Sequence, residues 1–470
     1  MRNRLLLLGA ALAAFGVSLF SGFHWDDYGI FSDPVLTAPS GWMGIWGLRR
    51  TEPLTNLTFW LNYQVGGRDP FTYHLIALAL YLGAALLAYE CLRRLLPERA
   101  ALAAAAVFAI HPMQAEAVNY VWARADLLGG AFCLAALLAW LSGRRWMGVA
   151  CFAGAVLSNE YCLAFPVVLL LAEGRACPTP TKRAPAIVAM FTLSAAALAR
   201  LIYMQRASHA LKYFLAEGPA IWRYLRLLAF PYGFTVDPDL RVPAVWLGAL
   251  AWAAILAAAV LTWRWRGREW SLWLLAGLVL LLPSSSCLPL ADYYADHRMF
   301  LAMFAFAAAA GLLLTRVKTP ALAVGVVTVL TLLSAVRTTV WLDDKALWQE
   351  AVRRAPEKVR PKIQLSRNLP ATEALEVLQR AQAEAPHDPA IPAEMGKVLL
   401  QERQVDPALI AFGEALALDP NKAEYYTDRG VALYMSGLTE RARADFERAL
   451  DIDPNFTEAT ENLRKLPPAQ

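Results

Sequence analysis

The sequence predicts an all-α protein, in which a bundle of about eleven transmembrane helices precedes an array of soluble helical repeats. Three observations support this fold class. Hydrophobic residues make up 58% of the 470 residues, more than a soluble domain of this length needs for its core. Long apolar runs recur as far as residue 341, and beyond it the chain is polar and repeats with a period of 34 residues. We therefore expect one domain at residues 1–342 and a second at 343–470.

Eleven apolar runs are the expected membrane spans, with an uncertainty of about two. Several are shorter than the roughly 20 residues that a straight helix needs to cross a bilayer, so we expect some broken or re-entrant segments. The runs lie at residues 4–22, 71–91, 100–111, 127–141, 146–158, 161–173, 184–204, 243–263, 270–290, 299–315 and 320–341. The first run also resembles a signal peptide, but no clear A-x-A site follows it, so we favour an uncleaved span.

Basic residues are concentrated in alternate connections between these runs, which the positive-inside rule places in the cytoplasm. The clusters are Arg2 and Arg4; Arg93, Arg94 and Arg99; Arg144 and Arg145; Lys182 and Arg183; Arg264, Arg266 and Arg268; Arg316 and Lys318. The other connections and everything after Trp341 are then extracytoplasmic. We expect a multi-pass protein of the plasma membrane, or of the inner membrane in a bacterium, that contacts membrane lipids.

Charge and cysteine content exclude other classes of protein. The formal net charge is only +5, and no basic stripe indicates a nucleic-acid partner. The six cysteines lie mostly inside apolar runs and form no C-x-x-C motif, so neither a disulfide framework nor a zinc site is expected. They are Cys91, Cys133, Cys151, Cys162, Cys177 and Cys287.

An acidic motif, residues 23–28, follows the first apolar run directly. Two adjacent carboxylates at the mouth of a membrane span are costly unless they bind a cation, pair with one or take up a proton. We interpret Asp26 and Asp27 as candidate catalytic carboxylates. The alternative, solvated residues of a connecting loop, is equally compatible with their position.

The segment after residue 341 contains two consecutive 34-residue windows that align without a gap. Gly396, Ala408, Phe412, Ala415 and Pro420 occupy the same positions as Gly430, Ala442, Phe446, Ala449 and Pro454. This spacing is typical of tetratricopeptide repeats, in which small residues let two helices approach closely. A degenerate unit at 343–386 and a capping helix at 456–466 complete the expected array, which binds a polypeptide or packs on its own membrane domain.

Blocks spread over nearly the whole chain resemble the transmembrane-and-tetratricopeptide family of GT-C class O-mannosyltransferase-like proteins. The blocks are HWDDYGIFSDP; EPLTNLTFWLNYQVGGRDPFTYHLIALALYLGAALLAYECLRRL; HPMQAEAVNYVWARADLL; LSNEYCLAFPVVLLLAE; and LLPSSSCLPLADYYADHRMFLAM. The chain departs from the family pattern at Asn159, where lysine is usual, at His297 for glutamate, and at Ala302 for proline. The resemblance implies a GT-C-type membrane bundle. It also implies transfer of a hexose such as mannose from a polyprenyl-phosphate donor to a protein hydroxyl on the outer face, with the repeats presenting the acceptor.

Such a transfer needs a base for the acceptor hydroxyl and cations for the departing phosphate. We assign the base to Asp26 or Asp27, and the donor phosphate to Arg124 and Arg298, because guanidinium presents a fixed fork of donors. Each arginine is also explained by an ion pair with nearby acidic residues. The supporting residues are His111, Glu116, Asp126, Glu160 and His297.

His111 and Glu116 leave a further choice open. The pair is compatible with a divalent metal ion, although we favour a helix end at His111-Pro112 and a Glu116 that orients the arginines.

Two functions from other classes compete with the enzyme. A non-catalytic scaffold would use the repeats to recruit envelope proteins, and a transporter of lipid-linked saccharide would carry charges near the bilayer midplane. Most charges lie in the outer connections, which favours chemistry at the membrane surface.

Overall fold

The computed structural model describes residues 1–47, 50–176, 183–204, 210–286, 288, 290, 292–316 and 320–467. None of these residues is in a β-strand, so the all-α prediction is confirmed. Cys177, Lys182, Cys287 and Lys318 lie outside the described residues. Two compact units divide the chain: Met1–Val236 with Leu240–Asp343, and Asp344–Gln470 with Asp237–Asp239. The assignment of 1–342 and 343–470 as two domains stays a prediction.

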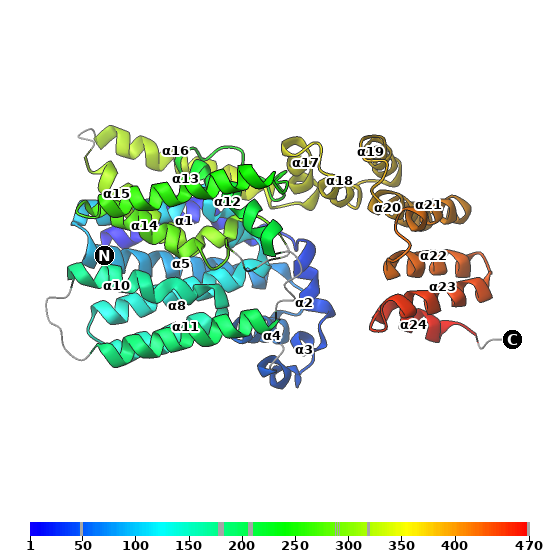
Figure 1. Ribbon diagram of the computed structural model, residues 1–470, viewed down its shortest axis with the longest axis horizontal. Coiled ribbons are helices and arrows are strands. Elements are labelled where there is room, and N and C mark those ends of the chain that lie inside the picture. The colour runs from blue at the N-terminus through cyan, green and yellow to red at the C-terminus, as the bar shows by residue number, and fades with distance from the viewer. Residues whose placement is uncertain are drawn as a thin grey trace. The chain divides into compact units, whose positions relative to one another are not determined.

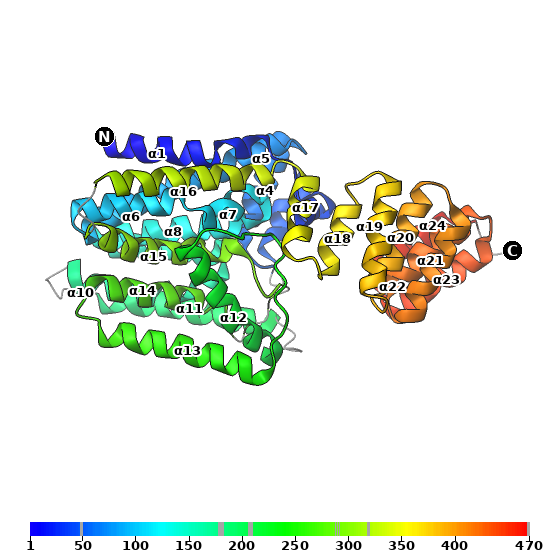
Figure 2. The same ribbon diagram turned by 90° about the horizontal axis from the view of Figure 1, so that it is seen from above.

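The first unit is a bundle of long helices joined by short helical turns (Figures 1 and 2). Its N-terminal elements are α1 (Arg2–Phe15), η1 (Gly16–Phe20), η2 (Trp25–Tyr28), α2 (Gly29–Ser32), α3 (Pro34–Thr37), η3 (Gly41–Trp46), α4 (Pro53–Gly66), α5 (Pro70–Leu95), α6 (Glu98–Ile110), η4 (Pro112–Gln114), α7 (Ala115–Asn119), η5 (Val121–Ala123) and α8 (Arg124–Leu141). The remaining elements are α9 (Arg145–Ser158), η6 (Glu160–Ala164), α10 (Phe165–Ala176), α11 (Ala184–Met204), α12 (Ala210–Ala229), α13 (Val245–Arg264), α14 (Glu269–Leu281), η7 (Asp296–Arg298), α15 (Met299–Leu314) and α16 (Pro320–Val340).

Among the described residues, seven helical segments are long and apolar enough to cross a membrane. They are Arg2–Phe20, Pro70–Leu95, Val121–Leu141, Ala184–Met204, Val245–Arg264, Asp296–Leu314 and Ala321–Val340. A bent pair, Glu98–Ile110 with Pro112–Asn119, adds an eighth candidate, and shorter apolar helices occupy Arg145–Ser158, Glu160–Ala172 and Glu269–Leu281. Two of the short segments, Arg145–Ser158 and Glu160–Ala172, match runs that were predicted to be short. The apolar helices identify a multi-pass membrane protein.

Proline explains two of these interruptions. The bent pair changes direction by 46° after His111, because Pro112 lacks an N–H and its ring disfavours a helical His111. The expected span at 270–290 is shorter than predicted: α14 ends at Leu281, and the next residue precedes Pro283. A helix of 13 residues is about 20 Å long, less than the roughly 30 Å hydrocarbon core.

Small residues allow the closest helix contacts in the bundle. A Cβ atom on Gly311 of α15 would lie 2.6 Å from Cβ of Ala104 and 2.5 Å from the carbonyl oxygen of Ala100, both in α6. Such approach of two backbones is how membrane helices associate when hydrophobic burial gives little driving force. Glu116 lies in α7, which follows α6 after η4, and His297 lies in η7, directly before α15, so the packing of α6 against α15 brings together the two segments of the site described below.

The acidic motif and the two turns that carry the site lie at one end of this unit. α1 and α6 end there and α5 begins there, while the N-terminus lies at the opposite end (Figure 1). The acidic motif, the turn after α6 and the turn before α15 are therefore neighbours in space.

The second unit consists of α17 (Asp344–Arg354), α18 (Val359–Ser366), α19 (Ala371–Glu384), α20 (Ala390–Gln401), α21 (Val405–Leu418), α22 (Ala423–Met435), α23 (Thr439–Ile452) and α24 (Thr457–Lys465). The predicted repeats are the pairs α20–α21 and α22–α23, and α24 is the predicted capping helix. Lys397 of α20 joins consecutive repeats by ion pairs to Glu424 at 2.7 Å and Asp428 at 3.4 Å in α22. The repeat array expected from the 34-residue period is confirmed.

Candidate active site

The two carboxylates of the acidic motif have different environments. Asp27 is fully buried, and its Oδ2 accepts a hydrogen bond from the backbone N–H of His24 at 3.0 Å. Its Oδ1 accepts one from the N–H of Trp122 at 2.8 Å. Burial raises the pKa of Asp27 to about 7, although His24 and these bonds oppose the shift. Asp27 therefore caps η2 and ties the first loop to the start of η5.

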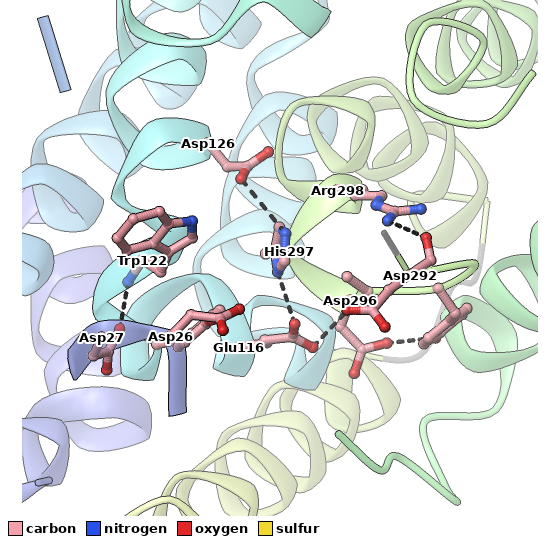
Figure 3. Close-up of polar contacts among 12 residues, drawn as sticks. Asp26, Asp27, Glu116, Trp122, Asp126, Asp292, Asp296, His297 and Arg298 are labelled. Atoms are coloured by element: carbon pink, nitrogen blue, oxygen red, sulfur yellow. Dashed lines mark hydrogen bonds and ion pairs between the residues drawn. The ribbon is translucent and has the colours of Figure 1, made fainter. Parts of the chain in front are cut away.

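Asp26 is exposed, and its Oδ2 accepts a hydrogen bond from the Tyr120 hydroxyl at 3.0 Å. Figure 3 shows the side chains of Asp26 and Asp27 in separate positions, with Asp26 on the side of Glu116. The Tyr120 ring also lies 6.1 Å from the His297 ring, centroid to centroid. Of the two predicted bases, Asp26 has the more accessible carboxylate.

Glu116 and His297 form the centre of the site. Glu116 is nearly fully buried, and its Oε1 lies 2.7 Å from Nδ1 of His297. Its Oε2 accepts a hydrogen bond from the backbone N–H of Asp296 at 3.0 Å. A proton on Nδ1 of His297 completes the first contact and directs Nε2 away from Glu116. Glu116 thus fixes the orientation of the histidine ring (Figure 3).

Asp126 lies on the other side of His297. Its Oδ2 is 3.9 Å from His297 Nε2, and its Oδ1 accepts a hydrogen bond from the Asn159 amide at 3.1 Å. Asn159 also accepts a bond from the N–H of Tyr161 at 2.9 Å. Two positions that depart from the family pattern, Asn159 and His297, therefore contact the same carboxylate.

Arg298 has three polar partners in two other segments, the turn at Asp292 and α12. Its Nη2 donates to the carbonyl oxygen of Asp292 at 2.6 Å and its Nη1 to the Tyr213 hydroxyl at 3.3 Å. The same Nη1 lies 3.5 Å from Oε1 of Glu217 in α12. Glu217 is fully buried, and burial raises its pKa to about 7 against the opposing charge of Arg298. These contacts fix the position of the Arg298 guanidinium, which belongs to η7 together with His297.

Arg124, the other predicted phosphate ligand, has a different environment. It is fully buried, and its Nη2 donates to Asn62 at 2.9 Å and to the carbonyl oxygen of Tyr73 at 3.2 Å. Its guanidinium lies over the Phe59 ring, 4.5 Å from the centroid. These contacts hold α4 and α5 against α8 and favour a structural role for Arg124.

The other supporting residues have separate partners. Nδ1 of His111 accepts a bond from the N–H of Met113 at 3.1 Å, and its Nε2 lies 3.3 Å from the carbonyl oxygen of Leu228. α6 ends at Ile110, where the favoured interpretation places a helix end, and His111 caps η4. The bonds of Glu116 go to His297 and Asp296 instead of the arginines that it was expected to orient. Glu160 pairs with Arg200 of α11 at 3.2 Å. Within the described part of the chain, no group of three His, Cys, Asp or Glu residues is arranged to hold a metal ion.

Two carboxylates near the site were not among the predicted residues. Glu217 lies in α12, between the expected spans 184–204 and 243–263, where no site residue was predicted. Glu52 is half-buried with φ of 55°, an uncommon conformation for a non-glycine residue. Burial, followed by the charges of Asp126 and Glu160, raises the pKa of Glu52 to about 8. The Glu52-Pro53 sequence that opens one of the resembling blocks was the signal that could have identified it.

Two curated proteins are similar to this chain over about a third of its length. The protein O-mannosyl-transferase TMTC3 of Mus musculus is 33% identical over 153 residues, which cover 30% of this chain and 17% of that protein. The protein O-mannosyl-transferase TMTC1 of Homo sapiens is 36% identical over 172 residues, which cover 33% of this chain and 19% of the relative. Over about a third of its length the chain is therefore similar to protein O-mannosyl-transferases. The resemblance inferred from the motif blocks is confirmed.

A family model matches part of the repeat array, and one solved structure aligns with nearly the whole chain. The tetratricopeptide repeat family model matches residues 423–456, which are α22 and α23. The crystal structure of ArnT from Cupriavidus metallidurans bound to undecaprenyl phosphate aligns with 99% of this chain and 81% of its own, with 15% identity and a TM-score of 0.41. Because the chain spans less than a fifth of the curated relatives' lengths, its activity and substrates are proposals.

Proposed function

We propose that this chain is a GT-C-type membrane glycosyltransferase that moves a sugar from a polyprenyl-phosphate donor to a hydroxyl group of an acceptor protein. One observation carries the proposal. An exposed carboxylate, Asp26, lies at the same end of the bundle as the hydrogen-bonded Glu116–His297 pair and the guanidinium of Arg298. Glycosyl transfer from a lipid phosphate requires a base for the acceptor hydroxyl, groups that orient the reactants and a positive charge opposite the departing phosphate. The names of the relatives make mannose the first sugar to test.

In this proposal Asp26 accepts the proton of the acceptor hydroxyl as its oxygen attacks the anomeric carbon of the donor sugar. The bond between that carbon and the phosphate oxygen breaks, and the electron pair leaves with the polyprenyl phosphate. The Tyr120 hydroxyl holds the Asp26 carboxylate in place before the acceptor arrives. Asp27 is the structural carboxylate, because both of its oxygens accept backbone hydrogen bonds.

Arg298 is the proposed partner of the donor phosphate, because guanidinium stays charged when it is desolvated. Glu116 and Asp126 orient His297 between them, so that its imidazole can hydrogen-bond the sugar or the phosphate. Arg124 has no substrate role in this proposal, because its side chain is fully buried and both of its Nη groups donate to acceptors inside the bundle.

The proposed orientation places Asp26 and the repeats outside the cytoplasm. It rests on the arginine clusters Arg2 and Arg4, and Arg93 and Arg94, which lie at the end of α1 and α5 opposite to the acidic motif. A reporter that is active only outside the cytoplasm, fused after Gln470, is expected to be active. Activity of a cytoplasmic reporter at this position would contradict the assignment.

The decisive experiment measures transfer from radiolabelled polyprenyl-phosphate sugars to protein in membranes that carry the wild-type chain or the Asp26→Asn variant. Label in protein with the wild type alone supports the proposal and identifies the sugar. Absence of label with every donor, from chain that is folded and correctly inserted, contradicts the enzyme and favours a scaffold that recruits partners through its repeats.

A further inference from the structure

A polar cavity lies at the end of the bundle opposite to the candidate active site. Its volume is about 320 Å³, and it is lined by the first residues of α1, the last turns of α5 and the first turn of α6. The lining includes Arg2, Arg4, Glu90, Arg93 and Glu98. No residue of the proposed transfer reaction belongs to it.

One carboxylate holds three guanidinium groups in this region. Glu90 accepts from Arg4 at 2.6 and 2.9 Å, from Arg93 at 2.7 Å and from Arg94 at 3.3 Å. A guanidinium has five N–H donors, so each arginine keeps donors that Glu90 does not use. The side chains of Arg4 and Arg93 remain 51% and 45% exposed, which leaves those donors accessible.

The cavity carries more positive than negative charge. Arg2 is exposed and, within the described residues, forms neither an ion pair nor a hydrogen bond. Three arginines in the lining, Arg2, Arg4 and Arg93, therefore face two carboxylates, Glu90 and Glu98. This excess, with Arg4 and Arg93 positioned by Glu90, suits a ligand with an anionic oxygen cluster such as a phosphate.

The position of the cavity along the helices indicates the source of that phosphate. α5 has 26 residues and is about 39 Å long, enough to cross the hydrocarbon core, so its end lies at the depth of the lipid headgroups. Next to the cavity, Leu5 and Leu6 of α1 are 60% and 58% exposed. An apolar surface beside a basic cavity fits acyl chains beside a phosphate.

We propose that this cavity binds the headgroup of an anionic phospholipid, with the phosphate held by Arg2, Arg4 and Arg93 and the acyl chains along α1. The site is independent of the transfer reaction. It would anchor the start of α1 to one leaflet and stabilise the bundle in an anionic membrane.

Native mass spectrometry of the purified full chain in detergent tests the proposal, with phosphatidylglycerol and phosphatidylcholine as probes. We expect phosphatidylglycerol to bind more tightly. The Arg4→Gln/Arg93→Gln variant should weaken its binding about 25-fold, because each arginine near a lipid headgroup contributes roughly a factor of five. The matched control Arg264→Gln/Arg266→Gln removes two exposed arginines from another connection and should change binding less than twofold.

A single substitution tests the site without disturbing the fold. Arg2→Gln breaks no contact within the described residues, so it should leave the melting temperature in phosphatidylcholine unchanged and weaken phosphatidylglycerol binding about fivefold. Equal affinity for the two lipids, or equal weakening in the control variant, would overturn the site. Full displacement of the lipid by millimolar inorganic phosphate would overturn the lipid assignment and indicate a soluble phosphate ligand.

Discussion

The imidazole of His297 and the carboxylate of Glu116 lie 2.7 Å apart although 181 positions separate them in the chain. The contact joins the turn after α6 to the turn before α15, and the same carboxylate binds the backbone of Asp296. At His297 the related family usually has glutamate, which would place a third carboxylate beside Glu116 and Asp126. A histidine here instead hydrogen-bonds Glu116 and faces Asp126.

The Asp26→Asn variant is expected to lower the transfer rate by about 10²- to 10⁴-fold, the usual contribution of a general base, without changing the melting temperature. Asp26 is exposed and bonded to one hydroxyl, so its loss leaves the fold intact. The matched control is Asp69→Asn, an exposed residue that caps α5 through the N–H of Phe71, a role that asparagine fills equally well. Transfer by Asp26→Asn at the wild-type rate would reject Asp26 as the base.

Asp27→Asn should act on stability instead. Asparagine places an NH₂ group opposite one of two backbone donors, which costs roughly 1–3 kcal/mol of unfolding free energy.

The effect of Asp27 should depend on pH. Its pKa of about 7 in the fold, against the ordinary value of 3.8, means that the folded state binds the proton more tightly. The wild-type free energy of unfolding should therefore fall as pH rises from about 4 to about 7. Thermal unfolding across this range should show the gap between wild type and Asp27→Asn narrowing with rising pH. A gap of constant size would contradict the assignment.

Arg298→Gln should raise the KM for the lipid donor about 10- to 100-fold, because a hydrogen bond to a charged group contributes roughly 1.5–3 kcal/mol. The single variant also leaves Glu217 buried without its cation, and should therefore lower the melting temperature. The Arg298→Gln/Glu217→Gln variant removes that isolated charge. We expect it to recover stability but not donor affinity, and recovery of both would show that Arg298 is purely structural.

Glu52 should make donor binding sensitive to pH. Its pKa of about 8 keeps it largely protonated at pH 7. Its ionisation at higher pH adds a negative charge that acts on His297, the residue proposed to contact the sugar or the phosphate. The KM for the donor should rise about fivefold between pH 7 and 9, the effect of roughly 1 kcal/mol of repulsion. Steady-state kinetics of Glu52→Gln should show a flat profile, with Glu98→Gln as the remote control that keeps the wild-type rise.

Gly396→Val should destabilise the repeat array by about 1–3 kcal/mol, the usual cost of overpacking. A Cβ at Gly396 would lie 2.6 Å from the Phe412 ring, and the next repeat has the same contact between Gly430 and Phe446. Gly413→Ala in α21 is the control, because nothing lies within 4 Å of its Cβ position. Proteolysis of the full chain in rising urea should cleave the repeats of Gly396→Val first, whereas equal cleavage of both variants would contradict this packing.

The sequence by itself determined the helical class, the apolar segments and the repeat array, because each depends on local composition or on a short period. Hydrophobic runs mark helices wherever they pack, and Gly396 and Phe412 lie within one repeat, so their spacing already indicates their contact. It also indicated the resemblance to the O-mannosyltransferase-like family, since the motif blocks are local. Proline at positions 112 and 283 explains afterwards why two segments bend or stop early.

Only the tertiary structure distinguished Asp26 from Asp27 and Arg298 from Arg124. These pairs are alike in residue type and in their place along the chain, and they differ in what distant segments bring to them. Asp27 is buried because the backbone of Trp122 reaches it, and Arg124 is occupied because Asn62 and Tyr73 accept its hydrogen bonds. Burial and hydrogen bonding are properties of the packed chain, so local sequence does not encode which partners each of two identical side chains meets.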